Sequence, residues 1–452
     1  MMIPEVVVDD GCDSRECTMP VLVAHLFGWS VGRSVGRWHY LCILYPITHM
    51  AYCSLSSSHN GDSGGGGGGG RGRMTAVDLD YDKAERDILL SGALNLVEIH
   101  SNIEALAEAS PSSYDGVLGV FCQVNFATHK KDPSSVPMFR HLVEASPGCT
   151  KERYQVSLKD LATKARAHDA EHMGGVPKAL KISGVVFHES RCGSTLVANS
   201  LIAMNPEKHR VYSESAPPIM ALRGVCGEDF QHCSTDQAAA LLRDVMYVMS
   251  RTDSAKEERV FFKIQSVGSR SIKVFQKAFP NVPWIFVYRD PVQVMMSQLE
   301  QGTKVANCVR PRVRPPTIVS DLLINKGSNA YSVTDEGYCA AHLATITQSA
   351  VDALNQAPEL GAAVNYKDLP HILYEQILPN HFNIPVTEQE TERIQKISGV
   401  YSKGVGDRKG FFHQDSARKE KAASREVRNA AAVYLQESFD ELEQFRAKYA
   451  TD

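Results

Sequence analysis

The segment KISGVVFHESRCGSTLVANSLIAM, residues 181–204, constrains the fold more than any other part of this sequence. Residues 182–187 are apolar and rich in β-branched and aromatic side chains, which is typical of a strand buried on both faces of a parallel sheet. A polar turn, HESRCGST, follows, and apolar residues then recur at helical spacing. This order predicts an anion site, because backbone N–H groups converge at the helix N-terminus and the helix dipole favours negative charge.

The turn differs from the loop that binds nucleoside triphosphates. That loop, GxxxxGK followed by Ser or Thr, requires a Lys immediately before its hydroxyl residue. Here Gly193 is followed directly by Ser194 and Thr195, and the cation, Arg191, precedes the Gly. An ordinary strand-to-helix turn is the alternative, so the assignment depends on later segments.

Expected strands and helices alternate from residue 181 onward. Strands are expected at 182–187, 209–214, 259–266, 283–288 and 362–366, and helices at 228–251, 271–279, from 292, and at 337–356. This alternation predicts an α/β domain with a central parallel sheet and helices on both faces. Residues 301–329 are rich in basic residues, Pro and Gly, which is typical of a mobile loop.

Three regions are expected along the chain. Residues 1–73 form a low-complexity extension, because a run of seven Gly cannot bury a core. Residues 74–175 form a mostly helical region of unknown role, with helices at 84–109 and 154–168, while 116–126 fits either a strand or a buried helical turn. The α/β domain then occupies residues 176–450.

Composition excludes some classes of protein. An apolar content of 43% and a charged content of 22% are typical of a soluble globular chain. A net charge of −4 argues against a broad basic face, so no nucleic-acid partner is expected. The 11 Cys residues lie at irregular spacings without a zinc pattern, and most are expected to be buried free thiols.

Residues 38–55 are the one membrane candidate. They are apolar-biased and follow Arg33 and Arg37, but His39, Pro46 and His49 interrupt them. Their uninterrupted apolar run falls short of the roughly 20 residues that a membrane-spanning helix needs. We therefore expect a cytoplasmic protein, and a type II membrane protein of the Golgi anchored through 38–55 is the alternative.

A second candidate site follows the strand expected at 283–288. Parallel-sheet proteins bind ligands at the carboxyl ends of their strands, and Arg289 lies at such an end. Its planar guanidinium can hold two phosphate oxygens at once. Ser297 lies two turns into the helix that follows. The alternatives are a surface ion pair for Arg289 and a plain helix surface position for Ser297.

Taken together, these motifs resemble those of sulfotransferases that use 3′-phosphoadenosine-5′-phosphosulfate (PAPS). The pattern Arg-x-Gly-Ser-Thr-Leu resembles the family's phosphosulfate loop, and IFVYRDPVQVMMS resembles its 3′-phosphate site, with Gln293 replacing the usual acid. Residues 364–369 resemble its Y-E-D-L element. Residues 402–407 resemble its late R-K-G-x-x-G-D segment, with one residue missing and a second basic group at 408–410. The resemblance covers about half of the chain and does not extend to residues 1–175.

The resemblance implies the P-loop-like sulfotransferase fold and transfer of a sulfuryl group from PAPS to a hydroxyl acceptor. No metal is required, because Arg and Lys supply the positive charge. The acceptor is a small molecule, a carbohydrate or a peptide. The residues implied to bind the nucleotide are Arg191, Cys192, Gly193, Ser194, Thr195, Arg289, Ser297, Lys403, Gly404 and Arg408.

The catalytic residues implied are Arg191, Lys263, Glu214 and His188. Lys263 matches the Lys of the family's K-T-H strand, where it would contact the bridging oxygen, but Gln265 replaces the His that serves many members as the base. Glu214 matches the Glu that tyrosylprotein and some carbohydrate sulfotransferases use, and a partly dry cleft would raise its pKa. His188 is the second candidate base. A snorkelling Lys263 and a surface or capping Glu214 are the alternatives.

Two other functions compete with this one. A P-loop kinase would use a similar turn, although the Lys of its loop is absent. A non-catalytic nucleotide-binding module is the second alternative, suggested by Gln265.

Overall fold

The computed structural model describes residues 40–44, 51–55, 77–78, 89–101, 113–227, 230, 234–300, 302, 305–402, 410 and 415–448. Contacts divide the chain into two compact units, Met1–Arg73 and Met74–Asp452. In the first unit, β1 (Tyr40–Leu44) and β2 (Ala51–Leu55) pair antiparallel within the membrane candidate 38–55. Within the described ranges, none of the helices combines the length and apolar character needed to cross a bilayer.

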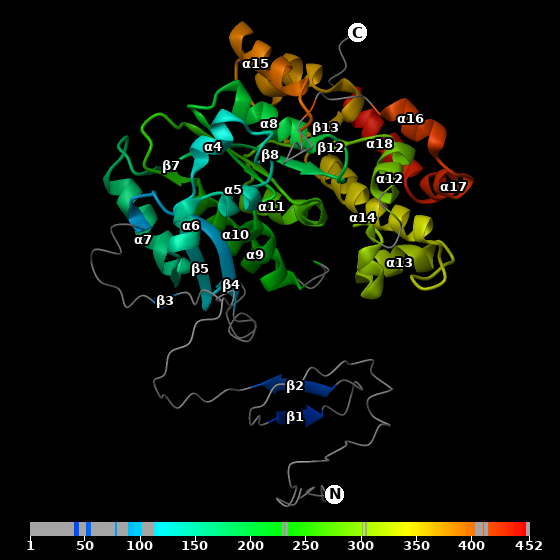
Figure 1. Cartoon of the computed structure of the whole chain (residues 1–452), viewed down its shortest axis with the longest axis horizontal. Coiled ribbons are helices and arrows are strands. Elements are labelled where there is room, and N and C mark those ends of the chain that lie inside the picture. Colours follow the sequence, from blue (N-terminus) through cyan, green and yellow to red (C-terminus); the bar gives the residue numbers. More distant parts are fainter. Residues whose placement is uncertain are drawn as a thin grey trace, which may run out of the picture. The chain divides into compact units, whose positions relative to one another are not determined.

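A five-stranded parallel sheet forms the centre of the second unit (Figure 1). Its order is β13 (Gly361–Asn365), β12 (Trp284–Tyr288), β8 (Lys181–His188), β11 (Arg259–Lys263) and β9 (His209–Ser213). These strands confirm the five predicted positions and the α/β fold. Because all five run the same way, their carboxyl ends meet at one edge.

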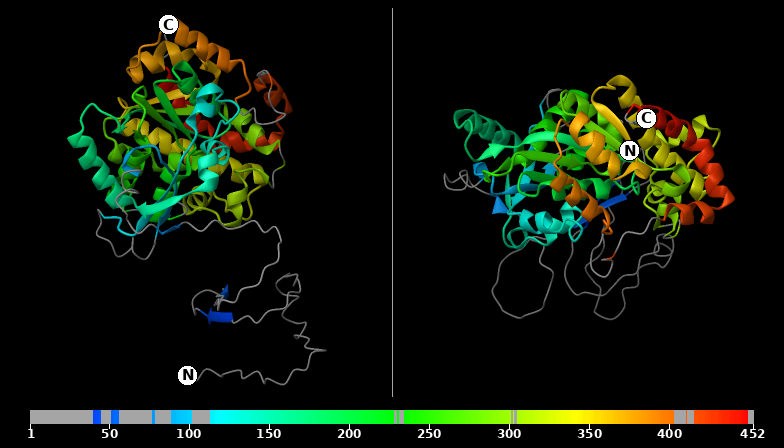
Figure 2. Two further views of the ribbon diagram at one scale, coloured as in Figure 1. Left: turned by 60° about the vertical axis from the view of Figure 1, so that its left-hand side comes forward. Right: turned by 90° about the horizontal axis from the view of Figure 1, so that it is seen from above.

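Helices cover both faces of this sheet, as predicted. One face, including Val186 and Phe261, packs on α8 (Ser194–Met204), the π-helix η5 (Leu373–His381) and α15 (Glu388–Ser398). The other face, including Phe187 and Phe262, packs on α9 (Ala216–Cys226), α10 (Thr235–Ser250), α11 (Ile272–Ala278), α14 (Asp335–Gln356) and α18 (Gln436–Arg446). Consecutive strand residues point to opposite faces, so both layers are anchored by the same strands. Figure 2 shows the two layers from other sides.

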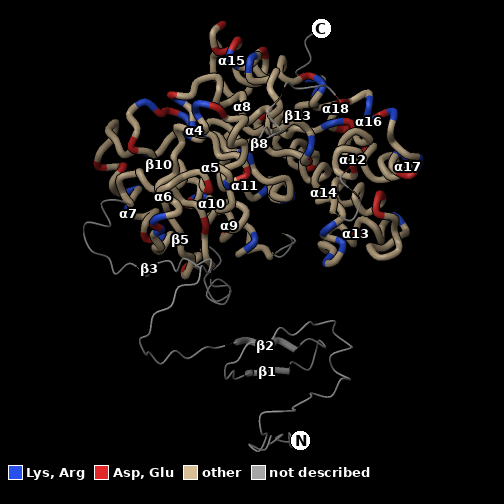
Figure 3. The backbone as a smooth tube through the Cα atoms, viewed as in Figure 1, with Lys and Arg blue, Asp and Glu red and all other residues tan. Residues whose placement is uncertain are grey.

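Short elements complete this domain. Two strands of two residues each, β7 (Lys178–Ala179) and β10 (Arg251–Thr252), form a small antiparallel sheet. Further helices of this domain are η1 (Ser266–Ser271), α12 (Pro291–Leu299), η4 (Tyr366–Asp368), α16 (Ser416–Ala422) and α17 (Arg425–Tyr434). Figure 3 shows Lys and Arg interspersed with Asp and Glu along these elements.

A four-stranded sheet corrects the helix predicted at 84–109 over Asn95–Ser101, while residues 84–88 and 102–109 lie outside the described residues. Its order is β3 (Val77–Asp78), β6 (Tyr154–Ser157), β5 (Val117–Cys122) and β4 (Asn95–Ser101). The prediction was wrong because Leu96, Val97 and Ile99 are all buried. A strand covered on both faces does not show the alternation that separates a strand from a helix.

Helices of the predicted N-terminal region pack around this sheet. They are α4 (Phe126–Lys131), α5 (Phe139–Glu144), α6 (Pro147–Lys151) and α7 (Leu158–Glu171). The segment predicted to be a helix, residues 154–168, instead begins with strand β6 and continues as helix α7. The rings of Phe126 and Phe139 pack edge-on against Tyr212 of β9, with centroids 5.6 and 5.1 Å apart. These contacts fix α5 beside the edge of the parallel sheet.

Two helices occupy the segment predicted to be a mobile loop, residues 301–329. They are η3 (Arg310–Val313) and α13 (Thr317–Asn325). Val319 and Leu323, four residues apart, are buried against Tyr338 of α14. The prediction was wrong because the Pro and basic residues around this short apolar stripe dominated the composition.

Disulfides correct the prediction of free thiols. Cys122 is bonded to Cys149 and Cys308 to Cys339, and Cys226 is also disulfide-bonded. Among cysteines whose side chains are described, Cys192 is the free thiol. Sequence spacing gave no sign of this because the partners lie 27 and 31 residues apart and meet only in the fold.

Loss of the Cys308–Cys339 bond is expected to destabilise the second unit. The bond closes a 31-residue separation and joins the segment before α13 to α14, so a Cys308→Ser/Cys339→Ser variant should lose on the order of 3 kcal/mol of unfolding free energy. Thermal unfolding measures this as a lower Tm. Each single substitution should have nearly the effect of the pair, because either breaks the same bond, and an unchanged Tm would contradict this bond.

Candidate active site

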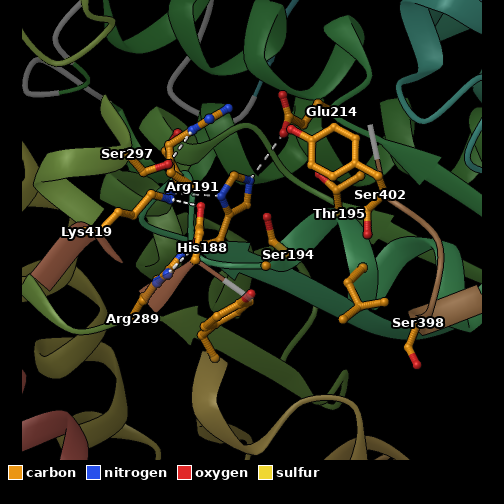
Figure 4. A pocket seen from close by; sticks show the side chains of 16 residues that line it. His188, Arg191, Ser194, Thr195, Glu214, Arg289, Ser297, Ser398, Ser402 and Lys419 are labelled. Atoms are coloured by element: carbon orange, nitrogen blue, oxygen red, sulfur yellow. Dashed lines mark hydrogen bonds and ion pairs between the residues drawn. The ribbon is translucent and has the colours of Figure 1, made fainter. Parts of the chain in front are cut away.

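One pocket lies at the carboxyl ends of β8, β9 and β12 (Figure 4). Its cavity volume is about 120 Å³, and the pocket is open to solvent. Its lining comes from the two predicted turns, from Glu214, from the motifs at 364–369 and 402–407, and from segments that the sequence left unassigned. The lining residues are His188, Ser190, Arg191, Gly193, Ser194, Thr195, Leu196, Glu214, Arg289, Ser297, Tyr366, Ser398, Tyr401, Ser402, Asp415 and Lys419.

The first predicted turn brings the start of α8 to the pocket. Ser190, Arg191 and Gly193 have φ angles of 78°, 56° and 87°, all in the left-handed region. A Cβ atom on Gly193 would lie 2.5 Å from Cδ2 of Tyr366, so only glycine fits there. The helix begins at Ser194, and its first N–H groups have no partner within the helix. The turn therefore presents backbone donors and the positive end of a helix dipole to the pocket.

The thiol of Cys192 points into the protein instead of the pocket. Its Sγ donates to the carbonyl of Val287 at 3.0 Å, and burial raises its pKa to about 12. The side chain therefore fastens the turn to β12. Any contact between Cys192 and an anion would involve its backbone.

The second predicted turn places a buried guanidinium in the same pocket. Arg289 is 4% exposed, and its guanidinium lies 4.3 Å from the ring centroid of Tyr366. Its Nε donates to Oε1 of Gln293 at 3.0 Å, and its Nη2 donates to Oδ1 of Asp415 at 2.9 Å and to Oγ of Ser416 at 3.0 Å. Arg289 thus forms an ion pair inside the pocket, not the surface pair considered as its alternative.

Hydrogen bonds join the two turns directly. Nε of Arg191 donates to Oγ of Ser297 at 3.0 Å, across 106 residues of sequence. The backbone N–H of Arg289 donates to Oε1 of Glu189 at 2.6 Å. Glu189 is fully buried, and this burial raises its pKa well above the usual value. The two turns are therefore held as one unit before any ligand binds.

An acid lies on the other side of the pocket from Arg289 and Ser297 (Figure 4). Glu214 follows β9 with a φ of 54°, and its carboxylate contacts the ammonium of Lys263. Lys263 is 1% exposed and does not line the pocket. Gln265 donates from Nε2 to the carbonyl of Glu214 at 3.4 Å. Lys263 and Gln265 therefore position Glu214, which is the member of this group that lines the pocket.

His188 lies between the first turn and Glu214. Its Nδ1 accepts the backbone N–H of Ser190 at 3.0 Å. A neutral ring bound in this way carries its proton on Nε2, which lies 3.6 Å from Oε1 of Glu214. His188 thus directs an N–H toward the acid, so Glu214 is better arranged than His188 to accept a proton.

The N-terminal region also approaches Glu214. Burial and the charge of Arg140 lower the pKa of His141 on α5, and the charges of Glu144 and Glu214 act in the opposite direction. Part of the region of unknown role, residues 74–175, therefore lies near Glu214: Oγ of Ser213 also lies 3.7 Å from Sδ of Met138.

Several pocket residues were absent from the predicted site. Tyr366 belongs to a recognised motif, but the motif gave no role to its ring. Asp415 and Lys419 had no usable signal, because charged residues near a short helix are common on protein surfaces. Three predicted residues, Lys403, Gly404 and Arg408, lie outside the described residues. The preceding residue, Ser402, lines the pocket, and its carbonyl accepts from Nδ2 of Asn199 at 3.1 Å.

Comparisons of this chain with known proteins found sulfotransferase structures of low similarity. The chain matches no protein-family model, and no curated protein matches it either. The sulfotransferase STF9 from Mycobacterium avium is 11% identical, with a TM-score of 0.39 over 82% of this chain and 98% of its own. The sulfotransferase domain of the Synechococcus PCC 7002 olefin synthase is 14% identical, with a TM-score of 0.26 over 61% of this chain and 98% of its own. Likeness at these low TM-scores does not establish a shared activity.

Proposed function

We propose that this chain is a sulfotransferase that moves the sulfuryl group of PAPS to a hydroxyl acceptor. One observation carries the proposal: Arg191 and Arg289, from turns at two different strand ends, line a single pocket with the N-terminus of α8. Two separated cationic positions suit a nucleotide that carries anions at both its 3′ and 5′ ends. The resemblance of both turns to sulfotransferase motifs supports the same ligand.

Each end of the pocket has groups suited to one end of the nucleotide. The N–H groups at the start of α8, the hydroxyls of Ser194 and Thr195, and Arg191 would hold the 5′-phosphosulfate. Arg289 and Ser297 would hold the 3′-phosphate, because guanidinium and hydroxyl groups donate to phosphate oxygens. The hydrogen bond between Arg191 and Ser297 fixes the two ends relative to each other.

The pocket also has the groups that sulfuryl transfer requires. PAPS supplies the sulfuryl group and a phosphate leaving group, on which negative charge grows during transfer. Arg191 and the α8 N–H groups would stabilise that charge, which is the role of preorganised donors in group transfer. Glu214 accepts the proton of the acceptor hydroxyl, and Lys263 holds its carboxylate in place.

A kinase that uses a nucleoside triphosphate is the second candidate. Its loop needs a Lys directly before the hydroxyl residue, and Gly193 occupies that position here. In the described chain, His, Cys, Asp and Glu form no cluster of a kind that would hold a metal ion.

The disulfides provide an argument about the cellular compartment in which the protein folds. The Cys122–Cys149 and Cys308–Cys339 bonds favour an oxidising environment, because cytosolic thiols are kept reduced. We therefore propose the secretory lumen, such as the Golgi, over the cytoplasm.

Turnover of sulfur-labelled PAPS tests the proposed function. The full chain is incubated with panels of sugars, phenols, peptides and small alcohols, with and without EDTA, and in parallel with labelled ATP. We expect label transfer from PAPS that EDTA does not abolish, because Arg and Lys supply the positive charge. Transfer of phosphate from ATP that depends on Mg²⁺ would support the kinase instead.

A further inference from the structure

We infer that the Asp415 carboxylate occupies the position of the nucleotide's 3′-phosphate, and that a 3′-phosphate must displace it from Arg289 and Lys419. The inference rests on the proposed function and goes beyond it. It makes Lys419 a further phosphate ligand and Asp415 a residue that competes with the 3′-phosphate and so weakens the binding of 3′-phosphorylated nucleotides.

The carboxylate bridges two buried cations inside the pocket. Oδ1 of Asp415 lies 2.9 Å from Nη2 of Arg289, and Oδ2 lies 2.5 Å from Nζ of Lys419. Arg289 is 4% exposed and Lys419 is 3% exposed, and all three residues line the pocket. Two acceptor oxygens held between an Arg and a Lys are an arrangement that a phosphate group can reproduce.

An anion is needed at this point because the two cations are close and poorly hydrated. Burial and the charge of Arg289 lower the pKa of Lys419, while Asp415 acts in the opposite direction. Burial would raise the pKa of Asp415, but hydrogen bonds from Arg289 and Lys419 outweigh it and hold that pKa below its usual value. Removing the carboxylate leaves two like charges without an anion between them, and a bound phosphate would restore the balance of charge.

The structure also offers the carboxylate another partner. Arg418 is 62% exposed, its Nη2 lies 3.9 Å from Oδ2 of Asp415, and its Nη1 pairs with Glu300 at 2.8 Å. Asp415 directly precedes α16, whereas Lys419 lies four residues later within it. A small movement of Asp415 toward Arg418 would therefore leave Lys419 in the pocket as a ligand.

Competition of this kind weakens the binding of one class of nucleotide and leaves the other unchanged. Wild-type protein binds a 3′-phosphate only in the fraction of molecules whose cations are released from Asp415, which weakens apparent affinity by that fraction. A nucleotide without a 3′-phosphate does not gain from the released cations. Asp415 therefore affects only ligands that carry this phosphate.

Calorimetric titration of two nucleotides tests the inference. Adenosine 3′,5′-bisphosphate and adenosine 5′-monophosphate are titrated into wild type, Asp415→Asn and the control Asp335→Asn, whose carboxylate pairs with Arg312 at 2.6 Å outside the pocket. We expect Asp415→Asn to bind the bisphosphate about tenfold more tightly than wild type. We expect its affinity for the monophosphate, and both affinities of the control, to be unchanged.

A second variant separates a phosphate ligand from a structural residue. Lys419→Met should weaken bisphosphate binding by at least about tenfold while leaving the monophosphate unaffected, and a thermal unfolding scan confirms that the variant is folded. Equal or weaker bisphosphate binding by Asp415→Asn would overturn the inference while leaving the proposed function intact. Failure of wild type to bind either nucleotide would overturn both.

Discussion

Replacing Glu214 by Gln is expected to lower kcat for sulfuryl transfer by about 10²–10⁴-fold, the contribution typical of a general base. Glutamine retains an oxygen that accepts a hydrogen bond from Lys263 but has no basic carboxylate. Affinity for adenosine 3′,5′-bisphosphate should stay near the wild-type value, because the phosphate groups are held by other residues. Initial rates at saturating PAPS, combined with calorimetric affinity for the bisphosphate, measure the two effects separately.

The control is Glu258→Gln, which removes a half-exposed carboxylate paired with Lys208 at 2.9 Å far from the pocket lining. Its kcat should be unchanged. Lys263 is buried, so the Tm of Glu214→Gln must show that the variant is folded at the assay temperature. Retained turnover in Glu214→Gln together with its loss in His188→Gln would assign the base to His188.

Replacement of either pocket arginine by Ala is expected to weaken PAPS binding strongly. Arg191→Ala removes the cation beside the α8 N-terminus, and Arg289→Ala removes the guanidinium stacked on Tyr366. We expect kcat/KM for PAPS to fall about 10²–10³-fold in each, through a higher KM in Arg289→Ala and through both a higher KM and a lower kcat in Arg191→Ala. Steady-state kinetics with PAPS as the varied substrate measure this.

A matched control is Arg428→Ala, since Arg428 is an exposed residue of α17 paired with Glu420 at 2.8 Å. It should leave KM unchanged. Arg289→Lys keeps the charge but loses the planar fork, so it should recover only part of the affinity. Wild-type KM values in both Ala variants would refute the assignment of the two turns.

The parts of the site that the sequence predicted are encoded locally. Gly193, Ser194 and Arg289 each lie within a few residues of a strand end, and the strands carry strong apolar runs. Parallel-sheet geometry then brings these turns to one edge, so the shared pocket follows from short segments read separately.

The parts that were missed depend on contacts distant in sequence. Asp415 reaches Arg289 across 126 residues, and no local pattern marks that pair. The strand Asn95–Ser101 does not alternate between apolar and polar residues, because both of its faces are covered. Lys263 lies at the end of β11, but only the fold shows that its ammonium contacts Glu214 and does not line the pocket.

A crystal structure of the full chain with adenosine 3′,5′-bisphosphate tests the central claim most directly. We expect the 5′-phosphate within hydrogen-bond distance of the Ser194 and Thr195 N–H groups and of Arg191, and the 3′-phosphate on Arg289 and Ser297. A nucleotide bound outside this pocket, or bound in it with either guanidinium turned away from its phosphates, would contradict the account.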